Sequence, residues 1–166
     1  MRLRSPDDII AAASEVSALT HAHIRSRLCC AYYSLLVKHL FEGVPLAQAM
    51  TLASEQLAPH VPADEHKALR RVLTGTIVGE PRDRVRSGGY VVDCLEASLW
   101  CACRYGSYAD AVLAAVNLGD DTDTTAAVTG GLAGVMYGIH AIPEALRAAI
   151  ARGEEIMVLA RAFADR

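Results

Sequence analysis

The chain has few aromatic residues and little net charge, and each shortage excludes a class of protein. Only 5% of the 166 residues are aromatic, while 52% are hydrophobic, with alanine prominent among them. This mixture favours closely packed helices over sheets. Lysine and arginine number 16 against 19 acidic residues, so the net charge of −3 provides no basic field for nucleic acid.

Cysteine is present, but without the spacing that a structural role needs. The odd number of thiols and the absence of a CxxC pair argue against a disulfide framework and a structural zinc site. The cysteines are Cys29, Cys30, Cys94, Cys101 and Cys103. The first residues, MRLRSPDD, carry acids where a signal peptide has an apolar run. Together these observations favour a cytoplasmic protein with reduced thiols.

One stretch, residues 125–142, lacks Asp, Glu, Lys and Arg, and Gly130, Gly134 and Gly138 recur within it every four residues. Such glycine spacing also occurs where membrane helices pack. The stretch is barely long enough to span a bilayer and follows directly on acidic residues, so we expect no membrane span but a buried central helix of a bundle. Each glycine lowers helix stability by about 1 kcal/mol relative to alanine, so we expect another backbone to approach it closely.

Apolar spacing and capping signals predict a single all-α domain over residues 1–166, a compact orthogonal bundle of eight or nine helices. The expected helices cover about residues 6–19, 22–42, 45–57, 62–73, 90–105, 108–116 and 121–137, with two more beginning near Pro143 and after Gly153. Residues 74–89 show little periodicity and predict a loop able to reach a site. The arginines at 82, 84 and 86 are interpreted as solvated, with contact to a pyrophosphate as a lesser alternative.

The strongest chemical signal is the segment GDDTDTT, Gly119–Thr125, in which three carboxylates accompany three hydroxyls. Mg²⁺ and Mn²⁺ take about six oxygen ligands, and this segment is rich in them. Asp121 and Thr124 share one face of a first helical turn, and Asp123 lies beside them. Because helix N-caps also favour Asp and Thr, capping remains an alternative to a metal site.

Several segments resemble the ADP-ribosylglycohydrolase family: SGGYVVDCLEASLW, SYADAVLAAVNLGDDTDTTAAVTGGLAGVMYG and, upstream, SALTHAH with FEGVPLAQAM. The resemblance covers the chain from about Ser17 to Pro143. It implies an all-α hydrolase that uses Mg²⁺ or Mn²⁺ to cleave the glycosidic bond between ADP-ribose and a protein side chain. The expected partner is therefore ADP-ribose or an ADP-ribosylated protein.

The resemblance also assigns roles to residues of this chain. It implies that the metal ligands are Asp121, Asp123 and Thr124. It implies that the ADP-ribose is bound by His21, Ser87, Gly88, Gly89 and Tyr90. Glycine lets backbone amides approach a ligand, and a tyrosine ring can stack on a base. On the residues alone, His21 as a solvent-facing or capping residue and Tyr90 as ordinary packing stay open. Asp120 stands where many family members have glycine.

Family members are longer, and their N-terminal half supplies a Thr-Asp-Asp-Thr motif and a catalytic Glu that have no counterpart in this sequence. The chain thus resembles a truncated form of the family fold, and its catalytic residues stay unassigned. Three ligands leave the octahedral demand of the metal unmet except by water, so we expect weak metal binding and weak or absent activity.

Removal of neighbouring helices would also leave one side of the Gly-rich helix bare. We expect a second copy of the chain, or a separate N-terminal chain, to cover that apolar surface. Three hypotheses therefore stand: a weak or inactive hydrolase that still binds ADP-ribose or metal, one half of a split hydrolase, and an oligomeric interaction module.

Overall fold

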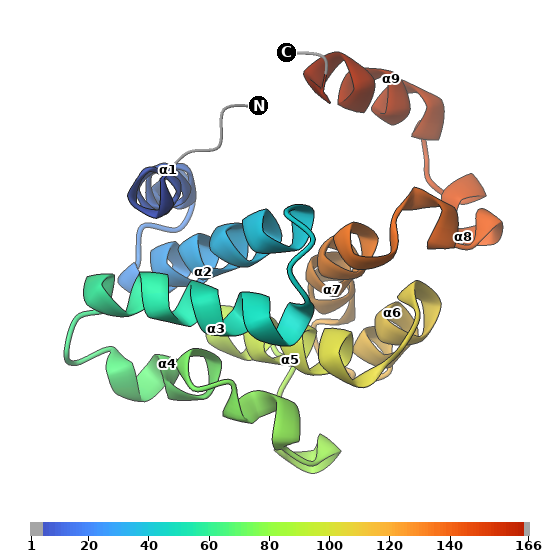
Figure 1. Ribbon diagram of the computed structural model, residues 1–166. Helices are drawn as coiled ribbons and strands as arrows, with labels where there is room; N and C mark the ends of the chain where they lie inside the picture. Colours follow the sequence, from blue (N-terminus) through green and yellow to red (C-terminus); the bar gives the residue numbers. More distant parts are fainter. Residues whose placement is uncertain (1–4, 165–166) are drawn as a thin grey trace.

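The computed structural model describes residues 5–164, and over this range the chain forms nine α-helices and no strand (Figure 1). The predicted all-α class and helix number are confirmed. The helices are α1 (Pro6–Ala18), α2 (Ile24–Phe41), α3 (Leu46–Leu57), α4 (His66–Leu73), α5 (Val91–Arg104), α6 (Tyr108–Val116), α7 (Thr122–Tyr137), α8 (Glu144–Ala148) and α9 (Gly153–Ala164). Residues 1–4 belong to the N-terminal segment that we expect not to be a signal peptide, and they lie outside the described residues.

Two helix starts differ in detail from their local sequence patterns, which are a Ser107-x-x-Asp110 capping box before α6 and Pro62 before α4. At α6 the Ser107 hydroxyl accepts the Asp110 amide at 3.1 Å, as a cap should. In a full capping box the Asp110 carboxylate would also accept a hydrogen bond from the Ser107 backbone amide. Here that carboxylate accepts from the Ser107 hydroxyl instead. α4 begins at His66 rather than near Pro62, because the Glu65 amide bonds to the Pro62 carbonyl in a tight turn.

The buried centre of the fold is α5, and this corrects the prediction that the Gly-rich helix is central. Ten residues of α5 are buried, and the helix packs against α2, α4, α6 and α7. α7 is buried on one side only, through Thr125, Thr129, Leu132 and Ala133. Asp123 and Ala127 are exposed on its other side. The expected open side of the Gly-rich helix is therefore present, although the helix does not form the core.

At the glycines of α7, side chains rather than another backbone make the close approaches, so the expected backbone contact is wrong. A Cβ at Gly131 would lie 2.3 Å from the Tyr33 Oη of α2. The ring reaches this position because its hydroxyl donates to the Val128 carbonyl at 3.1 Å. At Gly134 no heavy atom of a neighbouring element within residues 5–164 lies within 4 Å of the equivalent Cβ position. Only one of these two glycines is thus required by packing.

The uncharged stretch at residues 125–142 does not form one continuous helix. α7 ends at Tyr137, where Gly138 adopts a φ of +78° and leads into a short 3₁₀ helix, Ile139–Ala141. Glycine is suited to this left-handed conformation because it has no Cβ. No helix in the described part of the chain is long and apolar enough to cross a membrane.

The last two helices extend away from the rest of the fold (Figure 1). None of the described residues of α8 and α9 is buried. α9 nevertheless carries a run of apolar residues, and their side chains are exposed: Ile156, Met157, Val158, Leu159 and Phe163. The body that positions the candidate site is therefore made by α1 to α7.

Candidate functional site

The predicted metal ligands follow a sharp turn between α6 and α7. Gly119 and Asp120 have φ values of +90° and +55°. Left-handed backbone suits glycine and, among other residues, mainly Asn and Asp. This conformation explains why glycine would fit at the position of Asp120. The turn makes Asp121 the N-cap of α7 and puts Asp123 and Thr124 in the first helical turn.

Asp121 and Asp123 lie close together at the start of α7. The interaction with the Asp121 side chain, together with the Thr124 amide at 3.0 Å from Asp123 Oδ1, holds the pKa of Asp123 below its usual value. The Asp121 side chain makes no capping hydrogen bond to α7, so helix capping does not account for its carboxylate. Two ionised carboxylates at such close range repel each other unless a proton or a cation compensates their charge.

The Ser87–Tyr90 loop packs directly against this turn. The Asp121 amide donates to the Ser87 carbonyl at 3.0 Å, and the Ser87 hydroxyl donates to the Gly119 carbonyl at 3.0 Å. A Cβ at Gly89 would lie 3.6 Å from Asp121 Oδ2, whereas one at Gly88 would meet no heavy atom within 4 Å among the described residues. The structure thus brings the predicted ADP-ribose loop and the predicted metal motif, distant in sequence, to one place.

Tyr90, at the end of this loop, is held by Arg25, a residue that no sequence motif marks. Arg25 lies in the first turn of α2 and donates through Nη1 to the Tyr90 hydroxyl at 3.0 Å. Its Nε donates to Glu65 Oε2 at 2.5 Å. Tyr90 is 41% exposed, so its ring is not ordinary core packing and keeps a surface on which a ligand could stack.

His21 is exposed and stands outside this set of contacts. Its Nδ1 lies 3.0 Å from the Thr20 hydroxyl oxygen. Within residues 5–164, no hydrogen bond joins His21 to Tyr90 or to Asp121. The structure therefore brings together two of the three predicted parts of the site, and it leaves the third without direct contact.

An ion pair between a half-buried arginine and a buried glutamate supports the loop. Arg71 of α4 donates to Glu96 of α5 through Nε at 3.1 Å and, in a second contact, through Nη2. Arg71 Nη1 also donates to the Arg84 carbonyl at 3.1 Å, which ties the loop to both helices. Burial raises the pKa of the Glu96 carboxyl, and the Arg71 guanidinium opposes that shift. The two residues lie in no common motif, so the sequence offers no signal for the pair.

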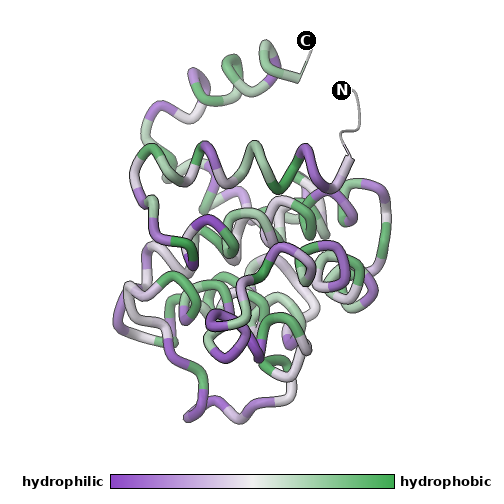
Figure 2. Tube along the Cα trace, turned by 90° about the vertical axis from the view of Figure 1, so that its left-hand side faces the viewer, coloured by the Kyte–Doolittle hydropathy of each residue, from purple (hydrophilic) through white to green (hydrophobic). Residues whose placement is uncertain are grey.

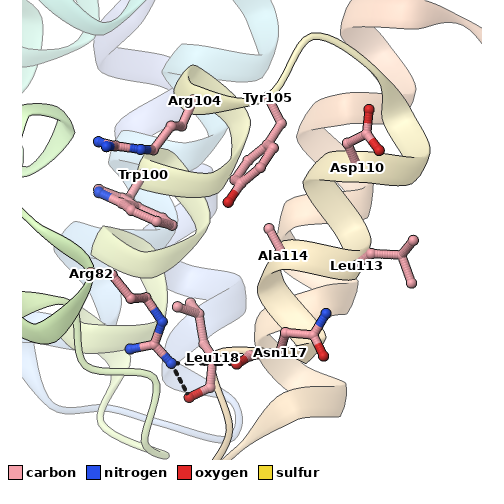
Figure 3. Close-up of a pocket in the computed structure, with 9 residues that line it drawn as sticks. All are labelled: Arg82, Trp100, Arg104, Tyr105, Asp110, Leu113, Ala114, Asn117 and Leu118. Atoms are coloured by element: carbon pink, nitrogen blue, oxygen red, sulfur yellow. Dashed lines mark hydrogen bonds between the residues drawn. The ribbon is translucent and has the colours of Figure 1, made fainter.

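Arg82 is exposed, but it is not merely solvated, as the sequence suggested. Its Nη2 lies 2.6 Å from the Leu118 carbonyl oxygen and 3.4 Å from that of Asn117 (Figure 3). Carbonyls at and beyond a helix C-terminus have no helical amide to bond, and they attract a cation. Proximity along the chain could not reveal this contact, because the loop and the end of α6 are far apart in sequence.

The oxygen donors near Asp121 match the kind that Mg²⁺ and Mn²⁺ take. They include the carboxylates of Asp121 and Asp123 and the hydroxyl of Thr124. One helical turn on, the buried Thr125 Oγ1 has no hydrogen-bond partner among the described residues. No group of three or more His, Cys, Asp or Glu side chains in residues 5–164 is placed to hold a metal, so Asp120 does not add a third carboxylate. The donors fit the metal in kind and are few in number.

Comparison with known proteins finds relatives over most of the chain. The ADP-ribosylglycohydrolase family model matches residues 1–166. The chain is 33% identical over 159 residues to the ADP-ribosylarginine hydrolase Tri1 of Serratia proteamaculans. The aligned region covers 96% of this chain and 41% of that protein. The chain is 29% identical over 125 residues to the ADP-ribosyl-[dinitrogen reductase] glycohydrolase of Rhodospirillum rubrum, which covers 75% of this chain and 37% of the relative.

A solved structure shows the same fold. The chain superposes on an ADP-ribosylglycohydrolase-related protein complex with a TM-score of 0.79 at 33% identity, covering 92% of this chain and 51% of the other. The chain thus spans about two fifths of the length of the curated relatives that it matches. Because the family model, the relatives and the fold agree over nearly all of its length, the chain belongs to the ADP-ribosylglycohydrolase family.

Proposed function

We propose that this chain forms one side of the active site of an ADP-ribosylglycohydrolase that acts on ADP-ribosylated protein. The observation that carries the proposal is the hydrogen bond of 3.0 Å from the Asp121 amide to the Ser87 carbonyl. It joins the two family motifs, each of which alone would be weak evidence for a site. Relatives named for ADP-ribosylarginine and for ADP-ribosylated dinitrogen reductase support ADP-ribosyl protein as the substrate class.

In the proposed site, one group of residues would bind the metal and another would bind the nucleotide. Asp121, Asp123 and Thr124 would hold Mg²⁺ or Mn²⁺, which when bound supplies positive charge that stabilises developing negative charge. Gly88 and Gly89 leave backbone amides open toward polar atoms of an ADP-ribose. The exposed ring of Tyr90, fixed by Arg25, would pack on the base or the sugar.

We further propose that this chain alone binds the metal weakly and has little or no hydrolase activity. Two carboxylates and one hydroxyl provide fewer oxygens than the roughly six that Mg²⁺ requires. The remaining ligands would come from water, from further residues of a longer protein, or from a separate chain. In the second and third cases, the open side of α7 is the face on which those residues would lie.

Titration calorimetry of the purified chain with Mn²⁺, then with ADP-ribose, tests the proposal. We expect weak Mn²⁺ binding that is lost in Asp121→Asn, and ADP-ribose binding that is weakened in Tyr90→Ala. Phe41→Ala is the matched control, because it removes another exposed aromatic ring, at the opposite end of α2 from Arg25. Equal ADP-ribose affinity in Tyr90→Ala and Phe41→Ala, or Mn²⁺ binding that survives Asp121→Asn, would contradict the proposed site. Turnover of an ADP-ribosylated protein by the chain alone would contradict the expectation of weak activity.

A second candidate function, an oligomeric interaction module, is favoured by α9. Figure 2 shows hydrophobic residues along this helix although it stands apart from the body. Leu159 and Phe163 are 72% and 76% exposed. We expect Leu159→Glu with Phe163→Glu to reduce self-association in light scattering, whereas Arg161→Glu, which changes charge on the same helix, leaves it unchanged. A defined homodimer that binds neither Mn²⁺ nor ADP-ribose would favour this module over the hydrolase.

A further inference from the structure

We infer that Arg82 is a positioning residue for the metal-binding turn, an inference that rests on the proposed function of Asp121 and Asp123. Arg82 touches neither carboxylate. It acts on the backbone just before them, where Nη2 donates to the Leu118 carbonyl at 2.6 Å and approaches the Asn117 carbonyl at 3.4 Å. Figure 3 shows the guanidinium extending from its own segment to these two carbonyls at the end of α6.

The contacts of Arg82 belong to a clamp formed by residues 82–87 on the turn at residues 117–121. Ser87 completes the clamp, because its hydroxyl bonds to the Gly119 carbonyl and its carbonyl accepts the Asp121 amide, each at 3.0 Å. Arg82 and Ser87 therefore satisfy three successive carbonyls and one amide of the turn. Asp120 is the one residue of the turn whose backbone has no partner in this clamp.

The turn needs such restraint because its backbone is unusual. Gly119 and Asp120 are both left-handed, and a non-glycine residue in that conformation is held there by its surroundings. Two consecutive residues of this kind reverse the chain within a few bonds, so a small rotation in either would move the N-terminus of α7. Asp121 and Asp123 would move with it, and a metal site tolerates only small displacements of its ligands.

The guanidinium is suited to this task in a way that an ammonium is not. Its rigid, planar fork can face two neighbouring carbonyls at once, whereas a lysine ammonium offers a point charge on a flexible chain. Arg86, four positions along the same segment, is exposed and makes no hydrogen bond from its side chain among the described residues. Arg86→Gln is therefore a control, because it removes the same charge as Arg82→Gln but no hydrogen bond to the turn.

The experiment measures amide hydrogen exchange in the metal-free chain and Mn²⁺ affinity in parallel. The variants are Arg82→Gln, Arg82→Lys and the control Arg86→Gln. Removal of a residue that orients a metal ligand typically weakens metal binding by about 10-fold or more. We therefore expect Arg82→Gln to lower the Mn²⁺ affinity by about 10-fold or more. We also expect the Asp121 amide of this variant to exchange about 10-fold faster. Arg82→Lys keeps one bond and lies between this variant and the parent. Arg86→Gln matches the parent in both measurements.

The two readouts separate the ways in which the inference can fail. Unchanged exchange at Asp121 in Arg82→Gln, or equal acceleration in Arg86→Gln, would show that Arg82 does not hold the turn. Faster exchange throughout α5 as well would make Arg82 a general stability residue and overturn the inference. If the parent binds no Mn²⁺, the proposed function fails, while exchange at the Asp121 amide still decides whether Arg82 positions the turn.

Discussion

Replacement of single glycines in α7 provides a sharp test of the packing. Alanine in place of Gly134 meets no neighbouring element, so it should stabilise the chain by about 0.5 to 1 kcal/mol through helix propensity alone. Alanine in place of Gly131 has the same propensity gain, but its Cβ would lie 2.3 Å from Tyr33 Oη. The tyrosine must then move, and its bond to the Val128 carbonyl is lost.

The magnitudes decide the sign at Gly131. The lost hydrogen bond costs about 1 kcal/mol, and the displaced, half-buried ring adds strain of about 1 to 3 kcal/mol. These costs exceed the propensity gain of about 0.5 to 1 kcal/mol, so Gly131→Ala should lower the free energy of unfolding by about 1 to 3 kcal/mol. In a Tyr33→Phe background the colliding oxygen is absent, and the ring Cζ at 3.6 Å is an ordinary contact. There Gly131→Ala should become stabilising.

Urea denaturation of the parent, both single variants and the double variant completes a thermodynamic cycle. We expect a coupling energy of about 2 to 4 kcal/mol between positions 33 and 131, because the two side chains compete for one volume. Gly134→Ala in both backgrounds is the control and should give the same gain in each. The reasoning is refuted if Gly131→Ala stabilises the parent as much as Gly134→Ala does, or if Tyr33→Phe leaves its effect unchanged.

Three further predictions follow from other parts of the structure. Arg71→Gln should lower the free energy of unfolding by about 3 kcal/mol near neutral pH, because it leaves the buried Glu96 carboxylate unpaired. Burial raises the pKa of Glu96, so the carboxyl takes up a proton as the pH falls and the deficit should shrink. Thermal unfolding over a series of pH values measures this, and a deficit that grows in acid would contradict it. Iodoacetamide at about pH 8 should label Cys30 first, because Cys30 is exposed whereas burial raises the pKa of the Cys101 thiol to about 12. Peptide mass spectrometry measures the labelling, and rapid labelling of Cys101 would be inconsistent with the fold. Asp120→Gly should leave stability unchanged or raise it, whereas Asp120→Val should lower it by more than about 1 kcal/mol, and equal melting temperatures would argue against the left-handed turn.

Much of the fold could be predicted from local signals, because helix ends are determined by nearby residues. Ser107 and Gly138 mark a start and an end of helices that the structure contains. The acidic segment Gly119–Thr125 and the Gly-Gly loop stand out in the sequence for a similar reason, since each is a short continuous segment. Their contact through Asp121 and Ser87 is tertiary, so the resemblance to a family could imply it but residue spacing could not.

The errors arise where side chains act across helices. The glycines of α7 suggested a central position, yet the core forms around α5, where small and apolar residues occupy every face. At Gly131 the missing Cβ accommodates a tyrosine ring from α2 rather than a helix backbone. Arg82 was expected to be solvated, and Arg25 and Arg71 carried no signal at all, because their acceptors are distant in sequence. A carbonyl at the end of a helix leaves no signal in the residue that binds it.

The double contact of Ser87 has a thermodynamic consequence. Its hydroxyl and carbonyl bond to the turn that carries Asp121, while the same residue begins the loop proposed to receive ADP-ribose. A ligand that orders this loop therefore also restrains the turn, and a cation that orders the turn restrains the loop. Binding of either would raise the affinity for the other, and by reciprocity the two factors must be equal. In the proposed site, nucleotide and metal would therefore bind cooperatively, coupled through one serine.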